Sequence, residues 1–451
     1  MTLGSALSTA RNSLKTSSGQ LGVVSQNIGS ARDTNYTHRT SHVLSGSYGT
    51  ITSRVIRDDN PQLLNNYMIK SSHSAAASAY ADGATRLSNI YNVNDYENSP
   101  TRLIDAFKKA LQLYANTPSQ RATGDAAIDR ARDLVTAINS GSREIEKVRT
   151  DIDSDIKDSV DHINDLLKQF QEVEKAISDE IGLGRDGFAY MDRRDAILKD
   201  LSQEIGITTV THPDGSMAIY GMDGSTLFDK VPRQITFSQS TALPAGTAGS
   251  QVLVDGVPLS HASFNSPYGS GKLGGLVKIR DEIAPQYQKQ LDETAAALYD
   301  IFKGPPELFE NGGDATVDGM AGRLSLNPLF DSKTAGGGPE NLGKDLQKLV
   351  DSLSESRTFT SESGLGEEQS LISFAKQSQS WMEGIRSNGA KDAEYQNAMF
   401  GRAAETLSNE TGVNTDDEMA LMLQLEQTYS ATARIISTVG RMLDDLMSAV
   451  K

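Results

Sequence analysis

The fold is decided near the C-terminal end, by residues 411–450, which read TGVNTDDEMALMLQLEQTYSATARIISTVGRMLDDLMSAV. Gly412 interrupts any preceding helix, and Asn414 can cap a new one. Acidic residues at positions 416–418 place negative charge in the first turn, where the helix dipole favours it. Apolar residues then recur at steps of three and four. Five are spaced by sevens: Met422, Tyr429, Ile436, Leu443 and Val450. This heptad spacing predicts a long helix that packs against another helix.

The first residues of the chain supply a matching helix. Four apolar residues are again spaced by sevens, and a second set fills the other core position: Leu7, Leu14, Leu21 and Ile28, with Leu3, Ala10, Ser17 and Val24. Residues 1–57 carry six basic side chains against one acid, and residues 401–451 carry four against eight. We therefore expect the two ends to pair, over helices of about 26 and 36 residues, or about 40 and 54 Å.

The C-terminal helix has more apolar surface than one partner can cover. A second apolar row runs beside the first: Leu421, Leu425, Ile435, Val439 and Leu446. The N-terminal helix can cover only one row, and an exposed apolar patch usually marks a binding site. We therefore interpret Leu3, Leu7, Leu14, Leu21 and Ile28, with Met422, Tyr429, Ile436, Leu443 and Val450, as a self-assembly seam that neighbouring subunits complete.

Short motifs at both ends resemble one family. Residues 24–31, VSQNIGSA, are followed by Asn35, Tyr36 and Arg39, and this run with Asn27 resembles the N-terminal signature of flagellar rod, hook and hook-associated proteins. Two residues depart from this signature: Asn35 replaces a usual Gly, and Gln26 replaces a usual Asn. Both departures are mild. The C-terminal run is similar to the other end of the same proteins, through Gly412, Asn414, Glu418 and Arg434.

The middle of the chain extends the resemblance. Residues 190–201, YMDRRDAILKDL, and residues 272–281, KLGGLVKIRD, are similar to inner segments of those hook-associated proteins that join hook to filament. The resemblance implies a structural, self-assembling flagellar component at the hook–filament junction. The partners it implies are further copies of the chain, hook protein, hook-associated protein 3 and an export chaperone. Four methionines in the last helix fit an adaptable chaperone contact: Met419, Met422, Met442 and Met447.

Between the ends, the pattern predicts a mainly α fold of nested elongated domains, with a β-rich insert at mid-chain. Residues 58–206 and 265–410 read as an inner bundle of long helices, including helices over 103–114, 125–138 and 145–181. Period-two segments and turns at 207–264 predict a β-rich outer domain. The terminal domain joins 1–57 with 411–451. Gly- and Ser-rich stretches at 335–343 and 354–366 read as loops.

Composition excludes several functions. A net charge of −16 argues against nucleic acid, no apolar run is long enough to span a membrane, and no cysteine is present for disulfides or thiolate sites. We expect no cofactor, no metal and no enzymatic activity. No apolar signal region precedes a cleavage site, so the resemblance implies export to the extracellular flagellum without a cleaved signal peptide.

Three patterns that suggest ligand sites are better explained structurally. Residues 182–187 fit G-x-G-x-x-G but follow a helix rather than a strand, so a turn is favoured over a dinucleotide site. Asp151, Asp153 and Asp155 imitate a calcium loop without its Gly and Glu, which favours a solvated helix face. His38 and His42 have metal-ligand spacing but no third ligand. Two alternatives stay open: a flagellin-like hook-associated protein, and a secreted adhesin or hydrolase carried on a flagellar scaffold.

Overall fold

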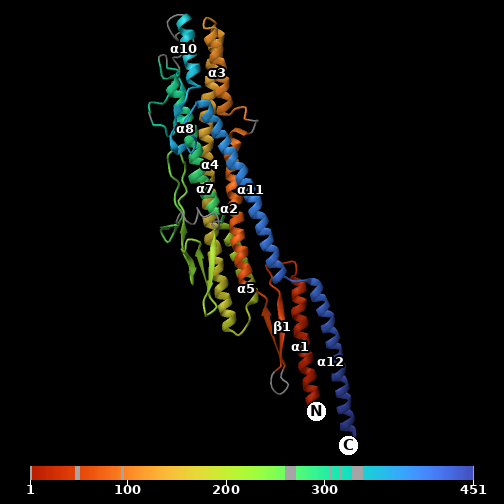
Figure 1. Ribbon diagram of the computed structural model, residues 1–451. Helices are drawn as coiled ribbons and strands as arrows, with labels where there is room; N and C mark the ends of the chain where they lie inside the picture. Colours follow the sequence, from red (N-terminus) through yellow and green to blue (C-terminus); the bar gives the residue numbers. More distant parts are fainter. Residues whose placement is uncertain are drawn as a thin grey trace.

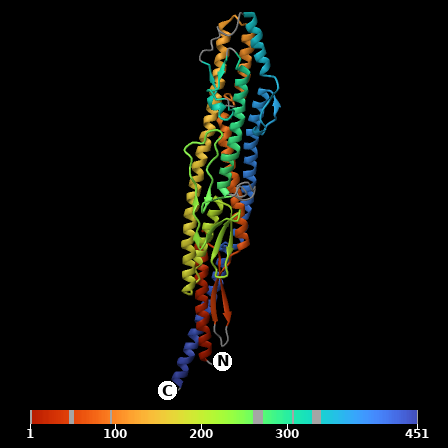
Figure 2. The same cartoon turned by 90° about the vertical axis from the view of Figure 1, so that its left-hand side faces the viewer.

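The computed structural model describes residues 3–45, 51–92, 96–259, 271–304, 307–314, 316–327 and 339–449. The molecule is elongated and mainly α-helical, as the sequence predicts, and its long helices follow one axis (Figure 1). Both chain termini lie at the same end, beyond the main bundle, in two perpendicular views (Figures 1 and 2). This arrangement follows from helices that can only be stable when they lie along others.

The two ends of the chain form a narrow terminal part. Helix α1 (Leu3–Ser30) packs along α12 (Thr415–Ala449), and the two run antiparallel (Figure 1). Strands β1 (Arg39–Ser45) and β2 (Ile51–Arg57) form an antiparallel hairpin beside α1. The hairpin register runs from the pair Arg39 and Arg57 to the pair Ser45 and Ile51.

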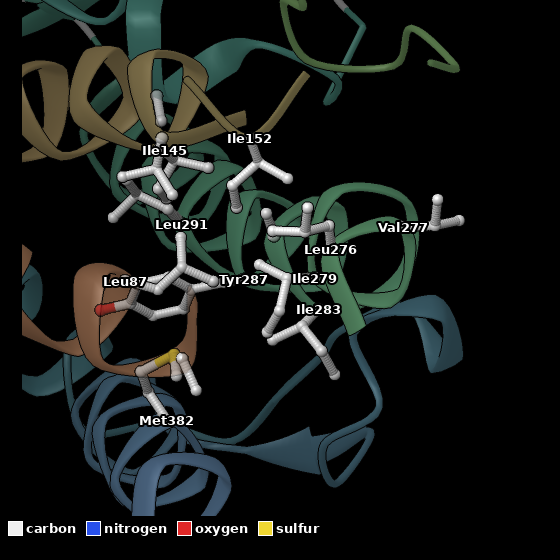
Figure 3. Close-up of a cluster of buried hydrophobic side chains, with 14 of the residues drawn as sticks. Leu87, Ile145, Ile152, Leu276, Val277, Ile279, Ile283, Tyr287, Leu291 and Met382 are labelled. Atoms are coloured by element: carbon white, nitrogen blue, oxygen red, sulfur yellow. The ribbon is translucent and has the colours of Figure 1, made fainter. Parts of the chain in front are cut away.

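The body is a bundle of long helices. Its main elements are α2 (Pro61–Asn92), α3 (Pro100–Asn116), α4 (Arg121–Gly182), α5 (Phe188–Glu204), α7 (Gly271–Lys278), α8 (Ala284–Phe302), α10 (Pro339–Ser352) and α11 (Leu371–Thr411). A π-helical turn, η2 (Ile279–Ile283), joins α7 to α8. Figure 3 shows where these helices meet, with Leu87, Ile145, Ile279, Tyr287 and Met382 all buried in one core.

The longest helix corrects a prediction. The sequence analysis expects separate helices over 125–138 and 145–181, whereas α4 is continuous from Arg121 to Gly182, or about 93 Å. Gly141, at the expected break, lies inside the helix. A Cβ at this position would overlap the Tyr91 hydroxyl. Tyr91 donates to the carbonyl of Ala137 one turn earlier, at 3.1 Å. Gly141 therefore permits close packing between α2 and α4 and does not end the helix.

Two glycine-to-alanine substitutions should have opposite effects. Gly141→Ala should lower the free energy of unfolding, because its Cβ needs the space of the Tyr91 hydroxyl and of Leu291. Gly384→Ala, inside α11 with nothing within 4 Å of the added Cβ, should raise it by about 0.5–1 kcal/mol. Urea denaturation followed by circular dichroism measures both changes. Equal stabilisation of the two variants would contradict the assigned packing.

The mid-chain insert contains two small antiparallel sheets. One has the order β3 (Ile207–Thr211), β4 (Met217–Gly221), β5 (Thr226–Asp229) and β6 (Val231–Pro232); the other has β7 (Ile235–Thr236), β8 (Leu253–Val254) and β9 (Val257–Pro258). Phe228 packs edge-on against Phe170 of α4, with 4.9 Å between ring centroids. The insert shares the core of the body. The division of the chain into three domains stays a prediction.

A second correction concerns the acidic face of α4. Asp153 is fully buried and pairs with Arg280 of η2, with 2.6 Å between Oδ1 and Nη1. Arg280 also donates to the carbonyl of Ser250 in the insert. The interpretation of this face as solvated is therefore wrong at Asp153, since α7 and η2 cover it. Asp155 instead pairs with Arg86 of α2, at 3.0 Å.

The segment between α8 and α11 is partly regular. It contains β10 (Phe309–Glu310), α9 (Met320–Arg323), β11 (Ser325–Leu326), β12 (Arg357–Thr358), η3 (Ser361–Ser363) and β13 (Glu368–Gln369). The loop expected over 335–343 is wrong from Pro339 onward, where α10 begins and packs on α3. Residues 335–338 lie outside the described residues. Trp381 of α11 lies beside Tyr287 of α8, with ring centroids 6.3 Å apart.

Candidate self-assembly interface at the terminal helices

The contact between α1 and α12 is centred on small and mixed side chains. On α12 the buried residues are spaced by sevens: Glu418, Leu425, Thr432 and Val439. On α1 the buried residues of the facing row are Ala10, Ser17 and Val24. Because Ala10 and Ser17 are small, the two backbones can approach closely at these levels. Because Glu418 and Thr432 are polar, the sequence does not show this row as a continuous apolar heptad.

The predicted seam residues flank this centre. Leu7, Leu14, Leu21 and Ile28 of α1 are half-buried, as are Met422, Ile436 and Leu443 of α12, while Tyr429 is exposed. Leu3 is the first residue of α1, but its side chain lies outside the described residues, as does all of Val450. The predicted seam is therefore displaced by one helical row from the most buried contact between the two helices.

Much of α12 faces solvent with apolar side chains. Eight large apolar residues are each at least 39% exposed: Met419, Leu421, Leu423, Tyr429, Ile435, Met442, Leu446 and Met447. Leu421, Ile435 and Met442 are separated by multiples of seven, so they share one row. We call these eight residues the exposed α12 row. Of the methionines assigned to a chaperone, three belong to it and Met422 is half-buried against α1.

Four residues of the N- and C-terminal motifs converge at the inner end of this helix pair. Asn27 donates to Oε2 of Glu418 at 3.0 Å and to the carbonyl of Arg39 at 2.9 Å. The hydroxyl of Tyr36 donates to Oδ1 of Asn27 at 2.7 Å. The buried Asn27 therefore links α1, β1 and α12 through its one side-chain amide.

The other four motif residues do not join this cluster. Asn414 caps α12 by accepting from the backbone N–H of Asp416 at 3.1 Å. Gly412 lies in the turn between α11 and α12, where its N–H donates to the carbonyl of Ser408. The backbone N–H of Asn35 donates to Asp33, and Arg434 is exposed on α12.

His38 is a further member of the cluster that the sequence pattern does not predict. Its Nδ1 lies 2.8 Å from Oδ2 of Asp58, and its Nε2 lies 2.8 Å from Oε1 of Glu418. Its backbone N–H donates to the carbonyl of Thr411 at the end of α11. The position of His38 between the motif residues Tyr36 and Arg39 was the available signal. His42, its apparent metal-ligand partner, is exposed on β1.

A second polar cluster fixes the hairpin to the body. Arg57 donates from Nε to Asp192 at 2.8 Å and from Nη2 to Asp195 at 2.6 Å. Arg39 donates from Nη2 to the other oxygen of Asp192 at 2.9 Å. All four side chains are nearly buried. Two arginines of the terminal part therefore clamp onto two aspartates of α5, whose segment the sequence analysis singled out by resemblance.

A groove of about 1350 Å³ opens where the terminal part meets the body. Its walls come from the end of α1, the start of α2, α5, β3 and the turn between α11 and α12. The chain itself crosses this region at residues 58–60 and again at 412–414. The two polar clusters thus supply side-chain contacts between the segments that meet near this groove. Among the described residues, no group of His, Asp or Glu side chains is arranged to hold a metal ion.

Comparison with known proteins identifies the class first. A family model described as the flagellar hook-associated protein FlgK helical domain matches residues 84–303. A second, described as the flagellar basal body rod FlgEFG protein C-terminal, matches residues 408–449, which include all of α12. Both descriptions are of flagellar axial proteins, so the class that these two segments resemble is that of flagellar rod and hook-associated proteins.

Individual relatives narrow the assignment. The chain is 23% identical to flagellar hook-associated protein 1 of Escherichia coli (strain K12) over 333 residues, which cover 71% of the chain. It is 20% identical to the protein of the same name from Bacillus subtilis (strain 168), with 98% of each chain covered. Its similarity is thus to flagellar hook-associated protein 1. The chain spans only 60% of the length of the Escherichia coli relative and 56% of that from Salmonella typhimurium.

A solved structure is also similar. The flagellar hook junction protein FlgK from Burkholderia pseudomallei aligns with 53% of this chain and 43% of its own, at 19% identity and a TM-score of 0.44.

Proposed function

We propose that this chain is a structural subunit of the bacterial flagellum that forms the junction between hook and filament. The observation that carries the proposal is the exposed α12 row on a helix pair that projects beyond the body (Figure 1). A helix with this much apolar surface needs further helices to cover it. Because the chain is similar to flagellar hook-associated protein 1, neighbouring subunits of a flagellar structure are the natural source of those helices.

The shape of the molecule supports a division of roles. The terminal part, 1–57 with 411–451, would form the self-assembling core through the seam and the exposed α12 row. The helical body, 58–206 with 265–410, would act as an outward spacer that carries the insert, 207–264. Subunits arranged in this way would contact hook protein on one side and hook-associated protein 3 on the other.

The proposed site of action is outside the cell, after export without a cleaved signal peptide. Among the described residues, no helix combines the length and apolarity needed to cross a membrane. Before assembly, the exposed α12 row would need cover, and we propose an export chaperone that holds Met419, Met422, Met442 and Met447. Methionine side chains adapt well to such a groove.

Deletion of the gene tests the proposed function. We expect cells with hooks but without filaments, and with filament protein released into the medium, because no surface remains on which the filament can start. Electron microscopy of the cells and immunoblotting of the medium measure the two effects. Complementation with the wild-type gene should restore filaments. Normal filaments in the deletion strain would overturn the proposal.

A further inference from the structure

One imidazole ring, that of His38, contacts the first turn of α12. The two nitrogens of His38 face carboxylate oxygens from two different segments, Asp58 after β2 and Glu418 on α12. The side chain of Glu418 is only 6% exposed, and that of His38 is 25% exposed. Among the described residues, the His38 ring and the Asn27 amide are therefore the side chains that bridge the hairpin and α12.

This geometry fits a protonated ring. A neutral imidazole has one N–H, so its second nitrogen would present a lone pair to a carboxylate oxygen 2.8 Å away. An imidazolium donates to both carboxylates at once. Loss of the proton therefore removes one hydrogen bond and leaves two carboxylates without a nearby cation.

Other charged groups near the ring cannot replace that cation. The guanidinium groups of Arg39 and Arg57 are occupied by Asp192 and Asp195 of α5. The two carboxylates also accept hydrogen bonds from neutral donors: Thr40 donates to Asp58, and Asn27 donates to Glu418. From α11 the contact is the carbonyl of Thr411, which carries no charge.

Loss of the His38 proton would affect the whole terminal part. The hairpin is clamped to α5 by the two arginines, so whatever fixes α12 to the hairpin also fixes the direction of α12 relative to the body. The covalent link of α12 to the body is the short turn 412–414, and the groove beside that turn leaves room for movement. A joint of this kind is stiff while its bridge is closed and loose when the bridge opens.

We propose that His38, Asp58 and Glu418 form a protonation-dependent joint, which holds α12 in one direction relative to the body when the ring is charged and releases it when the ring is neutral. Burial lowers the pKa of His38, but hydrogen bonds with Glu418 and Asp58 outweigh burial and raise the pKa above its ordinary value. With a raised folded-state pKa, the stabilisation is complete below about pH 6.5 and is lost as pH rises through the folded value.

The joint angle can be measured in the full chain, because the protein has no cysteine and accepts unique spin labels. Gln203→Cys on α5 and Ser430→Cys on α12 place both labels at exposed positions. Double electron–electron resonance should give a narrow distance distribution at about pH 5.5 and one at least about twice as wide at about pH 8.5. A distribution of the same width at both pH values overturns the proposal.

Three variants separate the joint from general effects of pH. His38→Gln cannot carry a proton, so its distribution should be wide at both pH values. His42→Gln removes an exposed histidine of β1, four residues further along the chain, and should behave as wild type. In a ¹³C-histidine NMR titration, Glu418→Gln should lower the midpoint of the His38 signal. Narrow distributions in His38→Gln, or an unmoved midpoint in Glu418→Gln, would contradict the assignment.

Discussion

Replacing Arg280 with alanine should destabilise the protein by about 3–5 kcal/mol, because Asp153 would be left charged, unpaired and without access to water. The substitution also removes the donor to the carbonyl of Ser250, so the insert loses a contact with the body. Urea denaturation monitored by circular dichroism measures the change. Arg233→Ala is the matched control, since its pair with Asp255 is exposed on both sides and contributes less than about 1 kcal/mol.

A double variant distinguishes the destabilisation caused by the unpaired charge of Asp153 from that caused by lost packing. The double variant Arg280→Met with Asp153→Leu leaves no unpaired charge at that pair, so it should recover part of the lost stability. A double variant less stable than Arg280→Ala would show that the side-chain shape, rather than the stranded charge, governs stability at this position.

Leu425→Asp should separate the terminal helices while the body stays folded. Leu425 is 8% exposed between α12 and α1, and burying an ionised carboxylate without a partner costs several kcal/mol. Spin labels at Ser18→Cys and Ser430→Cys, both exposed, report the pairing directly. We expect a narrow distance distribution in the parent and a broad one in the variant. Cells carrying the variant should not be motile.

The control for this prediction lies on the next residue. Gln424 is exposed, so Gln424→Asp adds the same charge to the same helix without burying it. Its distance distribution and motility should match those of the parent. If Leu425→Asp also leaves the distribution narrow, then Leu425 does not hold α12 on α1.

The sequence predicts the long helices and the pairing of the ends better than the details of their contact. Heptad spacing identifies α1 and α12, because apolar period is a property of the local sequence. On α1 the spacing includes the buried row of Ala10, Ser17 and Val24. On α12 it misses the buried row, because Glu418 and Thr432 interrupt it, and the predicted second row is split: Leu425 and Val439 are buried, whereas Leu421, Ile435 and Leu446 are exposed. The burial of Glu418 depends on Asn27 and His38, which lie nearly 400 positions away.

Other misses have the same origin. Gly141 resembles a helix break until Tyr91 is seen against it, and Asp153 resembles a surface acid until Arg280 covers it. In each case a partner distant in sequence decides the role of the residue. The spacing of His38 and His42 suggests only a metal site, whereas the partners of His38 are carboxylates brought together by the folding of both chain ends.

The location of the protein tests the central claim most directly. Antibodies raised against this chain and tagged with gold should label isolated flagella in a single narrow band where the hook meets the filament, as seen by electron microscopy. The deletion strain provides the control for specificity of the antibody. Label spread along the filament or along the hook, or absent from the boundary, would contradict the account.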